Sequence, residues 1–104
     1  MITHRRVYQG KPGNAQPIVA KLKEYEEFAD RGGNPLPYRI FTDRLSGATD
    51  RVVLELEAES IGQLEQVYAA RGNVQGYAEF LKRWQSEMMP LIEGAFAEMW
   101  RREV

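Results

Sequence analysis

One short segment, residues 51–57, alternates apolar and polar side chains more regularly than any other part of the chain. Successive side chains of a β-strand point to opposite faces of the sheet, so this alternation predicts a strand with one apolar face and one largely acidic face. Such a strand needs a sheet that is covered on its apolar face and carries charge on the other. The apolar face is Val52, Leu54 and Leu56, and the opposite face is Val53, Glu55 and Glu57.

Three further segments are typical of strands and complete a four-stranded sheet. Residues 2–9 alternate imperfectly, and residues 38–43 precede a polar connection that includes residues 46–48. Because this connection is short, residues 51–57 are expected to return antiparallel and form a hairpin. Residues 95–102 alternate again and predict a closing strand, with a helical extension as the alternative.

Residues 14–33 predict the first helix. Asn14 can cap its first turn, Pro17 is tolerated near the start, and the pair Gly32–Gly33 ends it. Apolar side chains recur at helical spacing, so the charged residues between them are expected on the solvent side. The apolar stripe is Ile18, Val19, Leu22, Tyr25 and Ala29, and the solvent side is Lys21, Lys23, Glu24, Glu26 and Glu27.

A second helical region follows residues 51–57. Ser60 and Gln63 form a capping-box pattern, in which each side chain accepts an amide hydrogen bond at the start of the helix. The pair Gly72–Asn73 is expected to divide the region into two helices, and Pro90 marks its end. The apolar stripe is Ile61, Leu64, Val67 and Tyr68 before the division, and Tyr77, Phe80, Leu81, Trp84 and Met88 after it.

This order of elements, β-α-β-β-α-α-β, predicts an α+β fold. It corresponds to a ferredoxin-like βαββαβ arrangement, with an antiparallel four-stranded sheet and helices on one face. The chain has 104 residues, which suits a single domain that covers residues 1–104.

The sheet face opposite the helices is expected to mix aromatic and charged side chains. A second copy of the chain could cover the aromatic groups, and buried charges need partners of opposite sign. We therefore predict a homodimer in which Arg6 and Arg39 meet glutamates of either chain. The expected face is His4, Arg6, Tyr8, Arg39, Phe41, Val53, Glu55, Glu57, Phe96, Glu98, Trp100 and Arg102. The expected dimer interface is Phe41, Val53, Glu55, Glu57 and Trp100.

The predicted hairpin, the strand-to-helix junction at residues 60–65 and the order of elements resemble the dimeric α/β-barrel superfamily. Within it, the chain is most similar to NIPSNAP-like small bacterial proteins. The resemblance spans nearly the whole chain, and it implies an obligate dimer with a pocket between each sheet and its helices. The superfamily includes cofactor-free monooxygenases and isomerases as well as proteins without an established activity, so the resemblance implies no single reaction.

Composition excludes several classes of function. The 14 Lys and Arg residues against 15 Asp and Glu residues leave no basic excess for binding nucleic acid. The chain has no cysteine, which excludes disulfides and Cys-ligated metals and suits a reducing, cytoplasmic location. No stretch is apolar and long enough to cross a bilayer, so no membrane partner is expected. No metal or nucleotide motif is present, and no metal site or cofactor is expected.

Three residues could have either a catalytic or a structural role: His4, Glu55 and Glu57. His4 is the single histidine and could act as a general base, but its position at the start of a strand favours a structural role. Glu55 and Glu57 point to the same face and could share acid–base work, although neutralising nearby arginines is the favoured interpretation.

The aromatic stripes of the second helical region either fill the core or line a pocket. The candidate pocket residues are Tyr68, Tyr77, Trp84 and Arg39. The leading hypothesis is a NIPSNAP-like dimeric α/β-barrel protein that binds or transforms a small apolar or aromatic molecule without a cofactor, as a monooxygenase or an isomerase would. The rival hypothesis is a non-enzymatic interaction module that acts through homodimerisation.

Overall fold

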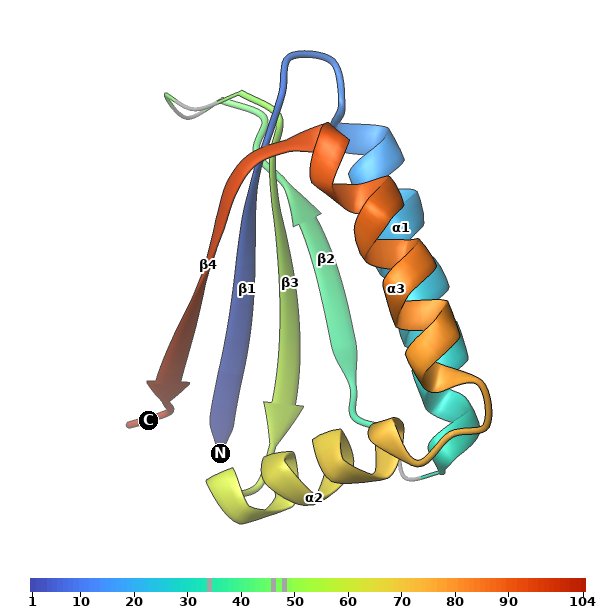
Figure 1. Cartoon of the computed structure of the whole chain (residues 1–104). Coiled ribbons are helices and arrows are strands. Elements are labelled where there is room, and N and C mark those ends of the chain that lie inside the picture. Colours follow the sequence, from blue (N-terminus) through green and yellow to red (C-terminus); the bar gives the residue numbers. More distant parts are fainter. Residues whose placement is uncertain (34, 46, 48) are drawn as a thin grey trace.

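The computed structural model describes residues 1–33, 35–45, 47 and 49–104, and it has the predicted order of elements (Figure 1). The predicted polar connection includes Ser46 and Ala48, which lie outside the described residues. The strands are β1 (Ile2–Gly10), β2 (Tyr38–Thr42), β3 (Arg51–Ala58) and β4 (Ile92–Arg101). The helices are α1 (Ala15–Ala29), α2 (Ile61–Gly72) and α3 (Tyr77–Met88), with 3-10 turns at Asp30–Gly32 and Met89–Leu91.

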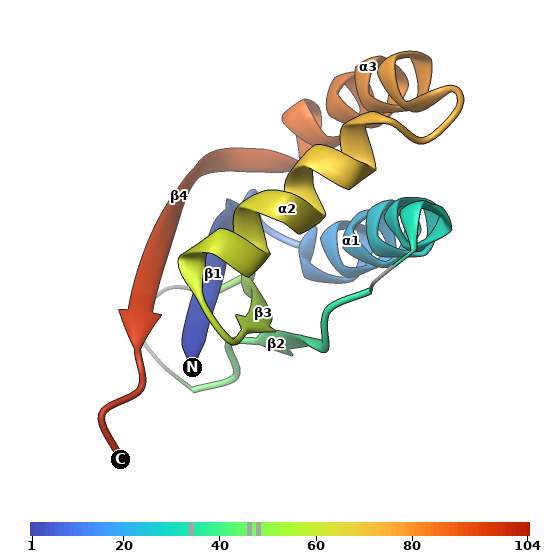
Figure 2. The same cartoon turned by 90° about the horizontal axis from the view of Figure 1, so that it is seen from below.

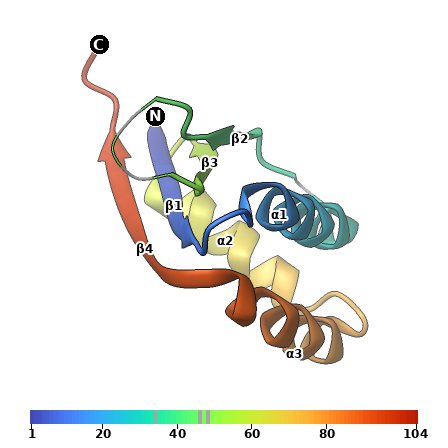
Figure 3. The same cartoon turned by 90° about the horizontal axis from the view of Figure 1, so that it is seen from above.

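The strands form one antiparallel sheet in the order β2-β3-β1-β4. The ferredoxin-like α+β architecture is therefore confirmed, with the second helical region divided into α2 and α3. Figures 2 and 3 show α1 beside α3, with α1 the nearer of the two to β2 and β3, while the far end of β4 extends away from both helices. Most of β4 is accordingly exposed. No helix in the described part of the chain has the length and apolar character needed to cross a membrane.

The apolar face of β3 builds the core as predicted. Val52, Leu54 and Leu56 are all buried, and they pack beneath the helices. In the part of the chain that the structure describes, the core consists of two clusters of buried side chains. The larger cluster joins Val52 and Leu54 to the inner stripes of α1 and α3, and the smaller one joins Leu56 to α2. The buried members of the larger cluster are Tyr8, Ile18, Leu22, Val52, Leu54, Trp84 and Met88. The buried members of the smaller one are Leu36, Leu56, Ala58, Leu64 and Val67.

The prediction for the faces of β1 is wrong. His4 lies opposite Leu56, Arg6 opposite Leu54 and Tyr8 opposite Val52. Residues directly opposite each other in an antiparallel pair share a face, so these three side chains point to the helices rather than away from them. Arg5 and Val7 lie on the other face, opposite Glu55 and Val53.

On the other strands, the predicted face is confirmed. Arg39 and Phe41 of β2 lie opposite Glu55 and Val53, and Phe96, Glu98 and Trp100 of β4 lie opposite Val7, Arg5 and Thr3. Arg102 follows the end of β4 and is not part of the sheet. We call this side of the sheet the open face; its described side chains include Arg5, Val7, Arg39, Phe41, Val53, Glu55, Glu57, Phe96, Glu98 and Trp100.

The helix starts are stabilised by side chains in two different ways. At α2 the Ser60 hydroxyl accepts the Gln63 amide at 3.1 Å, which confirms this half of the predicted capping box, while the Gln63 side chain accepts the Glu59 amide. At α1 the Asn14 side chain does not cap the helix, contrary to the prediction. It donates to the Leu91 carbonyl, and Asp50 Oδ1 accepts the Ala15 amide at 3.2 Å instead.

Candidate functional site

A cavity of about 390 Å³ lies between the helix-facing side of β1 and β3 and the three helices. We call it the helix-side cavity. Its aromatic wall is Tyr8, Tyr25, Tyr68, Tyr77 and Trp84. Its polar groups are His4, Arg6, Glu26, Arg71 and Gln85, and its aliphatic groups are Leu22, Leu54, Leu56 and Leu81.

His4 and Tyr68 form a hydrogen-bonded pair in this cavity. His4 Nδ1 lies 2.5 Å from the Tyr68 hydroxyl, and the two rings meet edge to face with their centroids 5.7 Å apart. Burial lowers the pKa of His4 below its ordinary value, and the nearby cations Arg6 and Arg71 lower it further. Burial raises the pKa of Tyr68 to about 12. At neutral pH the cavity therefore contains a neutral imidazole beside a protonated phenol.

Tyr25, Tyr77 and Trp84 make a second set of contacts that fixes the aromatic wall. The hydroxyls of Tyr25 and Tyr77 are 2.8 Å apart, and the rings of Tyr25 and Trp84 are 5.2 Å apart. Trp84 Nε1 donates to the Lys21 carbonyl at 2.6 Å, which fixes the indole against α1. Burial raises the pKa of Tyr25, so its hydroxyl stays protonated. These contacts hold the phenols and the indole in place without a ligand.

Glu26 and Arg71 form a buried ion pair that lines the cavity. Arg71 Nη2 lies 2.7 Å from Glu26 Oε2, and the two side chains are only 4% and 1% exposed. The Arg71 guanidinium also lies 5.3 Å from the Tyr68 ring centroid and 5.7 Å from that of Tyr25. Burial raises the pKa of Glu26, and the Arg71 charge opposes that rise. The pair places two opposite charges inside an aromatic wall.

The prediction that Glu26 faces solvent is wrong, and Arg71 was not predicted as a site residue. A signal for both was present in the helical spacing. Glu26 follows Leu22 by four residues, and Arg71 follows Val67 by four, so each continues the apolar stripe of its helix. A charged residue on each of two inward stripes indicates a buried ion pair.

The structure brings together three of the four predicted pocket residues. Tyr68, Tyr77 and Trp84 line the helix-side cavity, and their role in binding a ligand stays a prediction. Arg39 does not line it, and that part of the prediction is wrong. Because Arg39 lies opposite Glu55 on β2, it points to the open face, where it pairs with Glu57 and lies 3.9 Å from Glu55.

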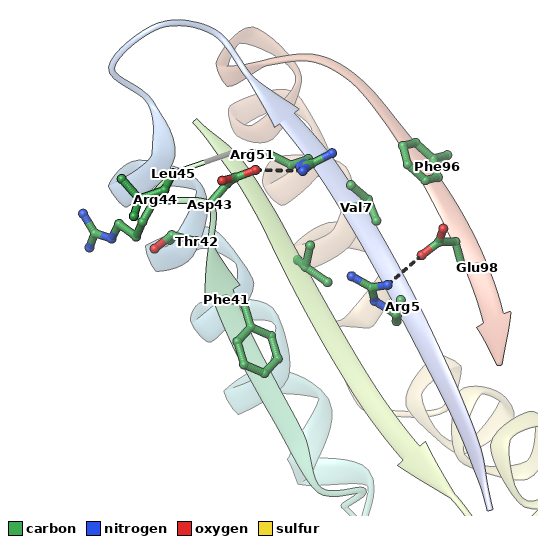
Figure 4. A pocket seen from close by; sticks show the side chains of 11 residues that line it. Arg5, Val7, Phe41, Thr42, Asp43, Arg44, Leu45, Arg51, Phe96 and Glu98 are labelled. Atoms are coloured by element: carbon green, nitrogen blue, oxygen red, sulfur yellow. Dashed lines mark hydrogen bonds and ion pairs between the residues drawn. The ribbon is translucent and has the colours of Figure 1, made fainter. Parts of the chain in front are cut away.

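The open face carries a network of ion pairs between exposed aromatic side chains, and Figure 4 shows one of these pairs, Arg5 with Glu98, together with Phe41 and Phe96. Arg5 lies 3.2 Å from both Glu55 and Glu98, so Arg5 occupies the place predicted for Arg6. Phe41, Phe96 and Trp100 are 48%, 57% and 56% exposed. A hollow of about 490 Å³ lies on this face, and Val7, Phe41, Val53 and Phe96 supply its apolar wall. The five predicted interface residues all belong to this face, and their role in a dimer stays a prediction.

This arrangement of sheet and helices has close structural relatives. An uncharacterised NIPSNAP domain protein from Burkholderia xenovorans has a TM-score of 0.75 at 12% identity, over 98% of this chain and 94% of that one. A NIPSNAP family protein from Agrobacterium tumefaciens has a TM-score of 0.70 at 19% identity, over 96% and 90%. The chain has the NIPSNAP fold. This confirms the predicted resemblance at the level of the fold.

The NIPSNAP fold also extends to a protein with a named reaction class. A Nitrosomonas europaea protein, assigned provisionally as an antibiotic biosynthesis monooxygenase, has a TM-score of 0.66 at 12% identity over 100% of both chains. No protein-family model matches the sequence, and no curated protein is similar to it. The comparisons therefore establish the NIPSNAP fold, and the chemistry must be argued from the side chains of this chain.

No cluster of three or more His, Asp or Glu side chains suited to a metal ion occurs in the described ranges of the chain. In the helix-side cavity, three pairs of titratable side chains are hydrogen-bonded instead, and one of them is Tyr25 with Tyr77. His4 bonds to Tyr68, and Glu26 bonds to Arg71. The arrangement supplies one group that can take a proton, one phenol that can donate a hydrogen bond, and a neutralised charge pair.

Proposed function

We propose that the protein binds a small apolar or aromatic molecule in the helix-side cavity. The observation that carries this proposal is the cavity itself, of about 390 Å³, with five aromatic side chains in its wall. Small-molecule sites are typically hollows of roughly 300 to 1,000 Å³ with an apolar lining and a few polar groups. The hydrogen bonds of Tyr25, Tyr77 and Trp84 hold this wall in place before a ligand arrives.

We further propose that His4 transfers a proton to or from the ligand. Its pKa is lowered by burial and by two arginines, so the imidazole is neutral and available as a base at physiological pH. Tyr68 orients the ring through the 2.5 Å contact with Nδ1. Removing a proton from an activated carbon or phenol gives an anion. Returning that proton to another carbon completes an isomerisation, whereas electron transfer from the anion to dioxygen begins an oxygenation.

The proposal includes a homodimer that forms through the open face. Three half-exposed aromatic side chains on that face would lose contact with water against a second copy. The charges between them are already paired within one chain, through Arg5, Arg39, Glu55, Glu57 and Glu98. Pairing reduces the cost of burying charges in an interface. A cytoplasmic location is also part of the proposal, and the absence of cysteine is consistent with it.

Native mass spectrometry of freshly purified protein tests the ligand and the dimer together. We expect a dimer that carries an additional small mass. Leu81 lines the cavity, so Leu81→Trp should fill it and remove the additional mass. Leu45 is 99% exposed in the β2–β3 connection, and Leu45→Trp makes the same change outside the cavity and should retain the mass. Equal retention in both variants would contradict binding in the cavity, and a monomer would contradict the proposed dimer.

The alternative function is a non-enzymatic interaction module that acts through homodimerisation. The aromatic side chains of the open face favour it. On this alternative, the dimer carries no additional mass, and Leu81→Trp leaves every property of the protein except its stability unchanged. The native mass spectrum of the wild-type protein therefore discriminates between the two functions.

A further inference from the structure

We propose that the ligand of the helix-side cavity is an anion and that Arg6 binds its acidic group. This inference rests on the proposed function, because it names the chemical class of the same ligand. The class is an apolar or aromatic molecule with one carboxylate, sulfonate or phenolate group. Arg6 would then be the residue that determines specificity for acids.

The charge balance of the cavity leaves one guanidinium without a carboxylate. Arg71 is neutralised by Glu26, whose carboxylate lies 2.7 Å away. Arg6 lines the same cavity, and no Asp or Glu side chain in the described part of the chain forms an ion pair with it. With His4 neutral, the cavity therefore carries a net positive charge. An anionic group in the ligand supplies the missing partner.

Arg5, which precedes Arg6 on β1, has a structural role in ion pairs. Arg5 lies on the open face, 3.2 Å from both Glu55 and Glu98. Arg6 lies on the opposite face, exposed at the rim of the cavity, with its guanidinium carbon 5.9 Å from the Tyr8 ring centroid. Two adjacent arginines on one strand thus have different environments. Two carboxylates pair with Arg5, whereas Arg6 interacts with the Tyr8 hydroxyl and has no carboxylate partner among the described residues.

The position of Arg6 suits an acid whose apolar part enters the aromatic wall. Arg6 lies two residues from both His4 and Tyr8 on β1, so all three point to the cavity. A planar guanidinium can bind a carboxylate or sulfonate through two parallel hydrogen bonds. The apolar part of the ligand would then extend toward Tyr25, Tyr77 and Trp84. His4 would lie between the acidic group and Tyr68, within reach of an adjacent atom of the ligand.

Two fluorescent probes that differ by a single anionic group test this inference. 8-Anilino-1-naphthalenesulfonate has an aromatic body and a sulfonate, and N-phenyl-1-naphthylamine has the same body without it. Fluorescence titration of the wild-type protein should give tighter binding of the sulfonate. Arg6→Gln should weaken sulfonate binding by about tenfold, because a hydrogen bond to a charged group is lost, and should leave the neutral probe unchanged. Arg6→Lys retains the charge, so its affinity for the sulfonate probe should fall by a smaller factor than that of Arg6→Gln.

Arg44→Gln is the matched control, because it removes the same charge from an exposed residue that lines the open-face hollow instead of the helix-side cavity. It should change neither probe. Equal losses in Arg6→Gln and Arg44→Gln, or no loss in either, would overturn the role of Arg6. The proposed function would survive that result if Leu81→Trp still abolished binding of both probes. If the wild-type protein bound neither probe, or if Leu81→Trp changed neither titration, the proposed function would fail together with the inference.

Discussion

The buried pair of Glu26 and Arg71 shows how single residues connect stability with the cavity. Removing a charged group from water costs free energy, whatever the sign of the charge. The attraction between Glu26 and Arg71 offsets this cost for both side chains. The aromatic rings of Tyr25 and Tyr68 flank the Arg71 cation and leave it little access to solvent. Loss of either charge therefore leaves its partner buried without compensation, at the wall of the candidate site.

Glu26→Gln should destabilise the protein by about 3 to 5 kcal/mol, because the buried Arg71 charge loses its counter-ion. Urea unfolding followed by circular dichroism measures this difference. Glu27 is the adjacent glutamate and is exposed, so Glu27→Gln makes the same chemical change and should cost no more than about 0.5 kcal/mol. Similar midpoints for the two variants would show that the pair contributes little to stability.

Strand β1 shows what the sequence could not predict about an element. The strand β3 was assigned correctly because its faces differ clearly in polarity. In β1 the adjacent residues Val7 and Tyr8 are both buried, since β1 lies between β3 and β4. Val7 is covered on the open face by strand neighbours, and Tyr8 is covered by the helices. Burial on both sides removes the alternation, so the pattern alone could not distinguish the faces of His4 and Arg6.

The residue that caps the start of α1 also could not be predicted from local sequence patterns. Asn14 is in the usual capping position, yet its side chain donates to the carbonyl of Leu91. The acceptor for the Ala15 amide comes from Asp50, which is 35 residues away along the chain. A capping pattern describes contacts within a few residues, so it cannot identify a cap supplied by another part of the fold.

Asp50→Ala should therefore destabilise α1 by about 1 kcal/mol or more, as expected when a helix loses its capping acceptor. Asp50 also has a positive φ of 60°, which adds strain for alanine. Asp50→Asn retains an acceptor and tolerates this backbone conformation, so its stability should fall less than that of Asp50→Ala. Thermal unfolding of the three proteins gives the comparison. If Asp50→Asn and Asp50→Ala unfolded at the same temperature, the proposed capping role of Asp50 would be wrong.

In the whole molecule, we propose a different function for each side of the sheet. The helix-facing side lines the cavity, and the open face is proposed to bind a second copy. The order of elements could be predicted from the sequence because helical and strand periods are local. The composition of the cavity could be predicted only in part, since it depends on which side chains from three helices meet over β1.

Glu55→Ala should weaken the proposed dimer. Glu55 lies between Arg5 and Arg39, so its loss removes the carboxylate that connects the Arg5–Glu98 pair with the Arg39–Glu57 pair. We expect the dissociation constant to rise on the order of tenfold, as for the loss of one partner from a buried charge network. Sedimentation velocity over a concentration series measures this constant. Glu65 is exposed on α2, and Glu65→Ala should not alter it. An unchanged constant for Glu55→Ala would exclude Glu55 from the interface.

The placement of Arg5 and Arg6 on opposite sides of β1 has a consequence for how such a protein can change over evolutionary time. Single substitutions on this strand alter one surface and leave the other intact. Insertion or deletion of one residue upstream of this pair would rotate every preceding side chain to the other side of the sheet, because the strand has a period of two. His4 would leave the cavity while its neighbours entered it. The length of β1 is therefore expected to be under stronger constraint than the identity of most of its residues.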